Sequence, residues 1–236
     1  RRNLDREANR FYAVPGYRSR YGAFVLGFYD WHWSRQLGGT LHLDYRVERG
    51  WGGGPDVKYD LGSFGAGDAR FYYLHDLDAD EVEDLRGERT DVPSDRHRFY
   101  FTHQALVSTN WSVKLVAREQ SDAYVTRDFF ESEYRDNTQP TSFAEVGRFW
   151  PNFSLNVLAQ PQINPFFETV ERLPDVKLTA LRQQIGKSFL FYESESSAGY
   201  YRRNFAEEDP AEDYAAFRGD TFHQLLVPRS LFGWLQ

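Results

Sequence analysis

The chain has 236 residues, a formal net charge of −7 and no cysteine. The lack of cysteine excludes disulfides, thiol nucleophiles and thiolate metal sites from this segment, and the negative charge argues against nucleic acid as a partner. No apolar run reaches ~18 residues, so the sequence predicts no transmembrane helix. The mean hydropathy of −0.67 would by itself indicate a soluble protein, but strands that alternate lipid-facing and lumen-facing residues also average to a low value.

In chain order, the first strand that the sequence predicts is the aromatic segment 22–33. The segment 40–47 follows and alternates strictly: Leu41, Leu43, Tyr45 and Val47 share one face, and Thr40, His42, Asp44 and Arg46 share the other. Such alternation is the period of a strand and not of a helix. Further strands are predicted at 57–61, 69–76 and 96–104.

The same alternation returns in the second half of the chain, at 111–118, 153–160 and 175–182. Weaker patterns indicate strands at 142–150 and 189–194, and the region from 222 onward can begin another. These segments predict an all-β, antiparallel fold of roughly ten or eleven strands, as part of a larger barrel of the kind that reaches ~26 strands.

The connections between these strands alternate in length. Short turns are predicted at 34–39, 63–68, 106–110, 151–152 and 185–188, and long polar loops at 48–56, 77–95, 121–141, 162–174 and 198–221. Short turns on one side and long loops on the other are typical of an outer-membrane barrel. We therefore expect residues 1–11 to be the end of a preceding segment and residues 12–236 to be a fragment of an antiparallel transmembrane β-barrel.

Polar residues on the alternating strands would be costly if they faced lipid. We therefore predict that one set of side chains faces a wide, water-filled lumen: Asp44, Arg46, Lys114, Arg118, Asn156 and Lys177. The apolar residues between them would then face the membrane.

The segment 12–76 resembles the opening strands of the lipopolysaccharide-assembly outer-membrane proteins, the LptD family, also known as organic solvent tolerance proteins (OstA). The resemblance rests on a proline–glycine approach, an aromatic strand ending near tryptophan and a series of later motifs in the family's order: Arg46–Gly50, Tyr72–Asp76, Arg96–Arg98, Gln120–Tyr124, a short helical stretch at 127–134, and Arg172–Pro174 with Val176 and Leu178. It covers roughly residues 12–182 and corresponds to the N-terminal part of the family's barrel. The family's second gate proline is replaced here by Gly27 and Phe28.

The resemblance implies transport rather than catalysis. Members of the family receive lipopolysaccharide from a periplasmic bridge and insert it into the outer leaflet of the Gram-negative outer membrane. Release occurs through a lateral gate between the first and last strands, and a plug lipoprotein occupies the lumen. On this sequence the gate candidates are Pro15, which lacks an amide hydrogen, and Gly16, Gly22 and Gly27, which have no side chains to pack.

Other interpretations stay open at this point. A different outer-membrane porin or transporter would share the alternation but not the ordered motifs, and a soluble, aromatic-rich β protein could bind carbohydrate. No catalytic constellation is recognisable, so we expect no enzyme activity and no cofactor. No metal site is expected either, because His97 and His103 are six residues apart, roughly 20 Å along a strand.

Overall fold

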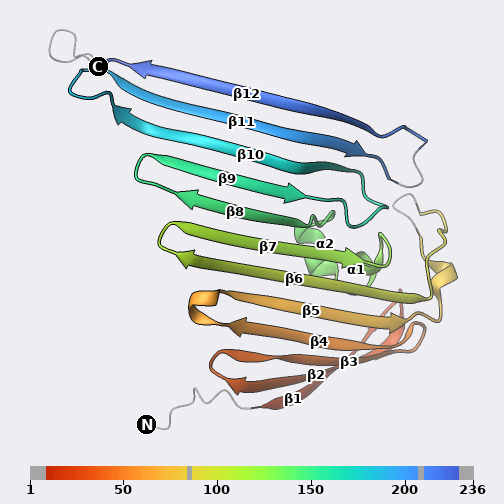
Figure 1. Cartoon of the computed structure of the whole chain (residues 1–236). Coiled ribbons are helices and arrows are strands. Elements are labelled where there is room, and N and C mark those ends of the chain that lie inside the picture. The colour runs from red at the N-terminus through yellow and green to blue at the C-terminus, as the bar shows by residue number, and fades with distance from the viewer. Residues whose placement is uncertain (1–8, 84–86, 207–209, 229–236) are drawn as a thin grey trace, which may run out of the picture.

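The computed structural model describes residues 9–83, 87–206 and 210–228 and contains one twelve-stranded antiparallel sheet (Figure 1). Each strand pairs with the next along the chain, so the spatial order equals the sequence order. The strands are β1 (Arg10–Arg18), β2 (Gly22–Ser34), β3 (Leu37–Arg46), β4 (Gly50–Asp60), β5 (Ala66–His75), β6 (Asp95–Ser108), β7 (Trp111–Gln120), β8 (Phe143–Phe149), β9 (Phe153–Gln160), β10 (Thr169–Gln184), β11 (Phe191–Asn204) and β12 (Tyr214–Leu226). The all-β, antiparallel prediction is confirmed. Within the described residues β1 and β12 do not pair, so the sheet is open.

The sheet has one strand more than the sequence predicted, and it lies at the N-terminal edge. β1 pairs along its whole length with β2, with Pro15 opposite Val25. The prediction that 22–33 is the first strand is therefore wrong. The alternation in β1 is interrupted by Pro15 and Gly16, and proline is tolerated here because an edge strand leaves one row of amides unpaired. Of the predicted preceding segment 1–11, residues 1–8 lie outside the described residues and the last two already belong to β1.

A second correction concerns the predicted long loop 48–56, because β4 begins at Gly50. The run Gly50–Gly54 forms a strand in which backbones and rings approach closely. A Cβ at Gly53 would lie 2.4 Å from the carbonyl oxygen of His42, and one at Gly52 would lie 2.5 Å from the hydroxyl of Tyr72. Glycine is required there by its neighbours on β3 and β5, and a local composition rule does not see those neighbours.

The connections gather at two ends of the sheet. At the left end in Figure 1 the turns are short and span 35–36, 61–65, 109–110, 150–152 and 185–190. The opposite end carries the longer loops 76–94, 121–142, 161–168 and 205–213, together with two short turns, 19–21 and 47–49. Besides 48–56, two further predicted loops are shorter than predicted, because β10 begins at Thr169 and β11 extends to Asn204.

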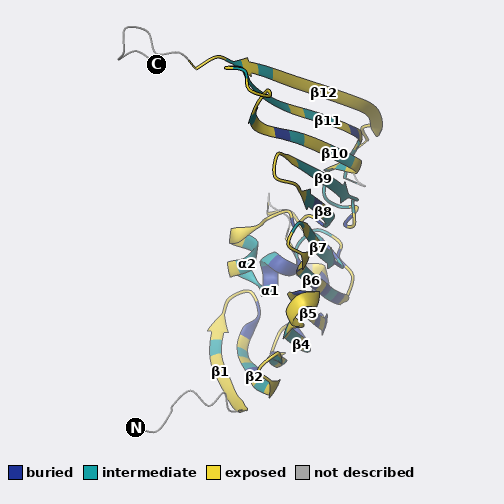
Figure 2. Ribbon diagram, turned by 60° about the vertical axis from the view of Figure 1, so that its left-hand side comes forward, coloured by how far each residue is buried: buried dark blue, intermediate teal, exposed yellow. Residues whose placement is uncertain are grey.

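The sheet curves, and its hollow side holds two short helices, α1 (Val125–Phe129) and α2 (Glu131–Asp136) (Figure 2). We call this side the concave face and the opposite side the convex face. Two short 3-10 turns, η1 (Gly62–Phe64) and η2 (Ala79–Glu81), lie in connections. In the described part of the chain no helix has the length and apolar character needed to cross a membrane.

Candidate functional site: the charged cluster on the concave face

The loop after β7 folds back over the concave face and carries α1 and α2. Asp122 starts the fold by accepting a hydrogen bond from the backbone N–H of Tyr124 at 2.9 Å. Phe130 separates the helices with a non-helical backbone, and α2 ends at Asp136. The helices are too short to be stable in isolation, so their position depends on contacts with the sheet.

Arg96 of β6 is the centre of those contacts, and its side chain is fully buried. Its guanidinium donates to Asp76 at 3.0 Å, to both carboxylate oxygens of Asp122 at 3.0 and 2.8 Å, and to Asp128 of α1 at 3.0 Å. Asp76 also accepts a hydrogen bond from Arg49 at 3.2 Å. The Arg96 guanidinium thus joins the connections 76–94 and 121–142, and Asp76 links the turn 47–49 to them through Arg49. The charge of Arg96 is compensated by the surrounding carboxylates.

A second buried group lies next to it across β3 and β5. The hydroxyl of Tyr72 donates to Asp44 at 2.8 Å and accepts from Arg46 at 2.7 Å, and Arg46 pairs with Asp44 at 3.2 Å. Tyr72 reaches these partners by lying over Gly52, where no side chain stands in its way. Buried polar groups of this kind stabilise only when their partners are in place.

The aromatic side chains between α1 and α2 complete the cluster. The Phe129 ring lies 5.1 Å from the guanidinium carbons of both Arg46 and Arg96, and Arg98 lies 3.2 Å from the ring centre of Phe130. Arg98 also pairs with Glu133 of α2 at 2.6 Å. Cations over aromatic faces attract electrostatically, more strongly when water is excluded. We call the set formed by Asp44, Arg46, Arg49, Tyr72, Asp76, Arg96, Arg98, Asp122, Asp128, Phe129, Phe130 and Glu133 the concave cluster.

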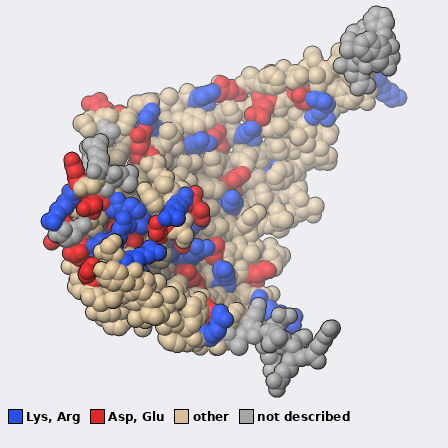
Figure 3. Space-filling view, turned by 180° about the vertical axis from the view of Figure 1, so that it is seen from behind, with Lys and Arg blue, Asp and Glu red and all other residues tan. Residues whose placement is uncertain are grey.

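The concave cluster fixes the loop 121–142 inside the hollow of the sheet. Figure 3 shows the concave side, on which Lys, Arg, Asp and Glu side chains are densest at the end that carries the loop. At the exposed rim of the loop, the hydrogen bond from Arg135 holds the pKa of Glu131 below its ordinary value. Because each carboxylate of the concave cluster has a cationic partner, the arrangement is suited to positioning a segment rather than to transferring protons.

The predicted lumen-facing residues all lie on this concave face. The strand register carries the face from Asp44 and Arg46 on β3, through Arg118 and Lys114 on β7, to Asn156 on β9 and Lys177 on β10. Asp44 and Arg46 are buried, whereas Lys114 and Lys177 are exposed. The prediction that they share one face agrees with the register, and that this face lines a lumen stays a prediction.

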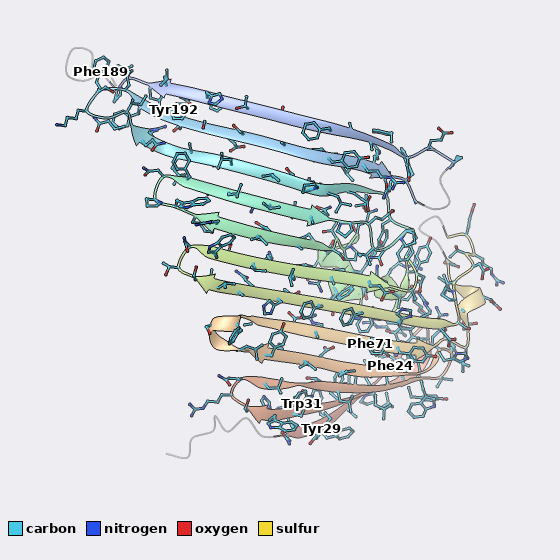
Figure 4. The ribbon with its side chains drawn as sticks, in the orientation of Figure 1. Phe24, Tyr29, Trp31, Phe71, Phe189 and Tyr192 are labelled. Carbon is cyan, nitrogen blue, oxygen red and sulfur yellow. The ribbon has the colours of Figure 1, made fainter. Side chains whose placement is uncertain are left out.

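The convex face is apolar and exposed. Figure 4, drawn from this side, shows Tyr29, Trp31 and Phe71 among its side chains. Exposed members of this face on β2–β7 include Val25, Tyr29, Leu41, Leu43, Tyr45, Trp51, Phe71, Tyr73, Phe99 and Leu115. Exposed apolar side chains that continue over six neighbouring strands are unusual on a soluble monomer and mark a surface that meets protein or membrane.

The gate candidates lie together on the first hairpin. Pro15 and Gly16 belong to β1, Gly22 begins β2 with φ +67°, and Gly27 pairs with Ala13 on one side and Leu43 on the other. A Cβ at Gly16 would lie 2.3 Å from the ring of Phe24, which covers the backbone there. Pro15 is therefore inside the edge strand and not before it, and the structure does not test its role in a gate.

The sequence predictions assigned no role to the central residues of the concave cluster. Arg96 and Arg98 alternate on one face of β6. Asp122 follows β7 in the motif Gln120–Tyr124, and Asp128 lies within the stretch 127–134 predicted to be helical. The unusual feature was two arginines at alternate positions beside aspartates in neighbouring loops. This arrangement of arginines and aspartates indicates buried ion pairs only when the loop 121–142 is known to fold over the concave face.

Comparison with known proteins supports a distant relationship to one family. The chain is 28% identical over 147 residues to the LPS-assembly protein LptD of Mannheimia succiniciproducens, a match that covers 61% of this chain. The matched region spans 18% of the length of that relative. No family model matches the chain.

Proposed function

We propose that this chain is part of an outer-membrane β-barrel that inserts lipopolysaccharide into the outer leaflet, and that its role is transport rather than catalysis. The observation that carries the proposal is the division of one long antiparallel meander into an apolar exposed face and a charged face. This is the pattern that a strand needs when one side meets lipid and the other meets water. The similarity to LptD supplies the cargo.

In this proposal the convex face meets the membrane, and Asp44, Arg46, Lys114, Arg118, Asn156 and Lys177 face the lumen. The end of the sheet that carries the long loops lies outside the cell, and the opposite end, whose turns are all short, lies in the periplasm. The concave cluster then holds the loop 121–142 inside the lumen, where a plug lipoprotein and lipopolysaccharide arriving from a periplasmic bridge would meet it.

The orientation of the faces can be tested directly, because the chain contains no cysteine. Single cysteines at Leu43, Val113 and Leu155 should resist a water-soluble thiol reagent in the full-length protein in membranes. Cysteines at Lys114, Asn156 and Lys177 should react. The reverse pattern would exclude the proposed placement of both faces.

The lateral gate is proposed at the free edge of β1. Pro15 cannot donate a ladder hydrogen bond, and each lost bond matters more in lipid, where water cannot replace it. The edge strand is thus a weak partner for the last strand of the barrel, whichever part of the full-length protein supplies that strand. The sequence placed the gate strand at 22–33, and we now propose β1 as the gate strand. The proposed mechanism, a weakened ladder of hydrogen bonds to the last strand, is unchanged.

We predict that a disulfide joining β1 to the last strand of the full-length protein will stop delivery of lipopolysaccharide to the cell surface. Reduction of that disulfide should restore delivery, and Pro15→Ala alone should slow it by a few fold. The matched control is a disulfide within the first hairpin, between Val14→Cys and Leu26→Cys, which are already paired. Normal delivery by the protein with the β1 seam cross-linked would show that β1 is not the gate.

A further inference from the structure

Arg148 occupies an exceptional position on the convex face. Along the described strands β1–β9, the register places Asp95, Glu119 and Arg148 as the charged side chains of that face. Asp95 lies 2.8 Å from His75, and Glu119 lies 3.2 Å from His97. Arg148 lies at the other end of the sheet, next to the short turns, and forms no ion pair with the described part of the chain.

The Arg148 side chain is held between two tryptophans. Its guanidinium carbon lies 4.9 Å from the ring centre of Trp111, its neighbour across β7, and 4.5 Å from that of Trp150. Its Nε is buried and has no hydrogen-bond partner. A guanidinium presents its donors in a planar fork that matches carboxylate and phosphate oxygens. The rings therefore fix the orientation of a cation whose donors have no acceptor among the residues that the structure describes.

An apolar hollow lies beside this arginine at the same end of the sheet. It has a volume of about 390 Å³ and is lined by Trp150, Pro151, Asn152, Phe153 and Leu178. Trp150 is shared between the hollow and the arginine. The combination presents one cationic group and one apolar surface to the same ligand.

We propose that Arg148, Trp111, Trp150 and the adjoining hollow bind an anionic glycerophospholipid. The phosphate accepts hydrogen bonds from the Arg148 guanidinium, and the start of an acyl chain occupies the hollow beside Phe153 and Leu178. Tryptophans prefer the depth of the lipid headgroups, and a cation at that depth gains from an anionic lipid. The inference rests on the proposed function, since it needs the convex face to meet the membrane. It adds a lipid site to the periplasmic end.

The test uses the full-length protein in phosphatidylcholine nanodiscs that contain a minor fraction of acyl-brominated lipid. Brominated phosphatidylglycerol should quench tryptophan fluorescence more than brominated phosphatidylcholine does, with about a fivefold enrichment of the anionic lipid at the site. Arg148→Gln should remove the difference and leave quenching by phosphatidylcholine unchanged. Arg148→Lys should keep only part of it, because lysine lacks the planar fork.

The matched control is Arg182→Gln, which removes an arginine near the same end that is already paired with Glu193 at 2.9 Å. This variant should behave like the wild type. If Arg148→Gln keeps the preference for phosphatidylglycerol, the lipid site is wrong while the membrane placement stands. If neither brominated lipid quenches the wild type, the proposed membrane placement itself fails, and the lipid site fails with it.

Discussion

The strands β2–β7 and the strands β8–β12 use the same alternation but treat their concave charges differently. At the loop end of β2–β7 the loop 121–142 covers the charges of the concave cluster, and Arg96 is fully buried among three aspartates. In β8–β12 the pairs remain exposed, as in Lys177–Glu195 at 2.7 Å and Arg218–Asp220 at 2.6 Å. The alternation of a strand determines which residues lie on its polar face, whereas a segment that covers this face determines how much each ion pair contributes to stability.

The largest effect is expected for Arg96→Ala, which tests whether burial of the ion pairs separates the two regions. The substitution leaves Asp76, Asp122 and Asp128 buried without their shared cation, so the free energy of unfolding should fall by roughly 3–5 kcal/mol. We expect this loss in a urea titration of the full-length protein in detergent micelles. Arg218→Ala, at an exposed pair, should leave the free energy of unfolding close to that of the wild type, because solvent screens the attraction between exposed charges.

If Arg96→Ala also prevents folding, limited proteolysis of the membrane-inserted fraction gives a second measurement. The loop 121–142 should become the first site of cleavage, because Arg96 ties both Asp122 and Asp128 to the sheet. Equal cleavage of this loop in the variant and the wild type would mean that the cluster does not hold it.

A smaller effect is expected for Tyr72→Phe. The variant removes the hydroxyl that bridges Asp44 and Arg46 but keeps the ring over Gly52, so the loss should be roughly 1–3 kcal/mol in the same titration. Tyr73→Phe is the matched control, because the adjacent Tyr73 lies on the convex face and donates to the exposed Asp95. If Tyr72→Phe and Tyr73→Phe lower the free energy of unfolding equally, the covered and the exposed face do not differ in how their hydrogen bonds contribute to stability.

The smallest effect should come from Lys177→Ala. Lys177 and Glu195 are both about half exposed, at 47% and 53%, so their attraction is screened by solvent. The free energy of unfolding should change by about 0.5 kcal/mol or less. A loss comparable with that of Arg96→Ala would show that burial does not distinguish the two regions.

Most strands, and the face of the sheet on which their side chains lie, could be predicted from the alternation in the sequence. Alternation predicted the strand 153–160 with the bounds that β9 has, and it assigned Asp44, Lys114, Asn156 and Lys177 to one face although they lie on different strands. This works because the period of two is local, and antiparallel pairing preserves the face from strand to strand.

Features that depend on contacts between residues distant in the sequence could be recognised only in the tertiary structure. Gly50, Gly52, Gly53 and Gly54 are typical of a loop in the sequence, but in the structure they belong to β4, to which β3 and β5 approach closely. β1 is recognised as a strand only by its pairing with β2. Arg96 meets Asp76, Asp122 and Asp128 because the loop 121–142 folds inward over the sheet. A charged residue that is solvated at the surface and one that is buried against distant carboxylates cannot be distinguished in the sequence. Only the fold separates them.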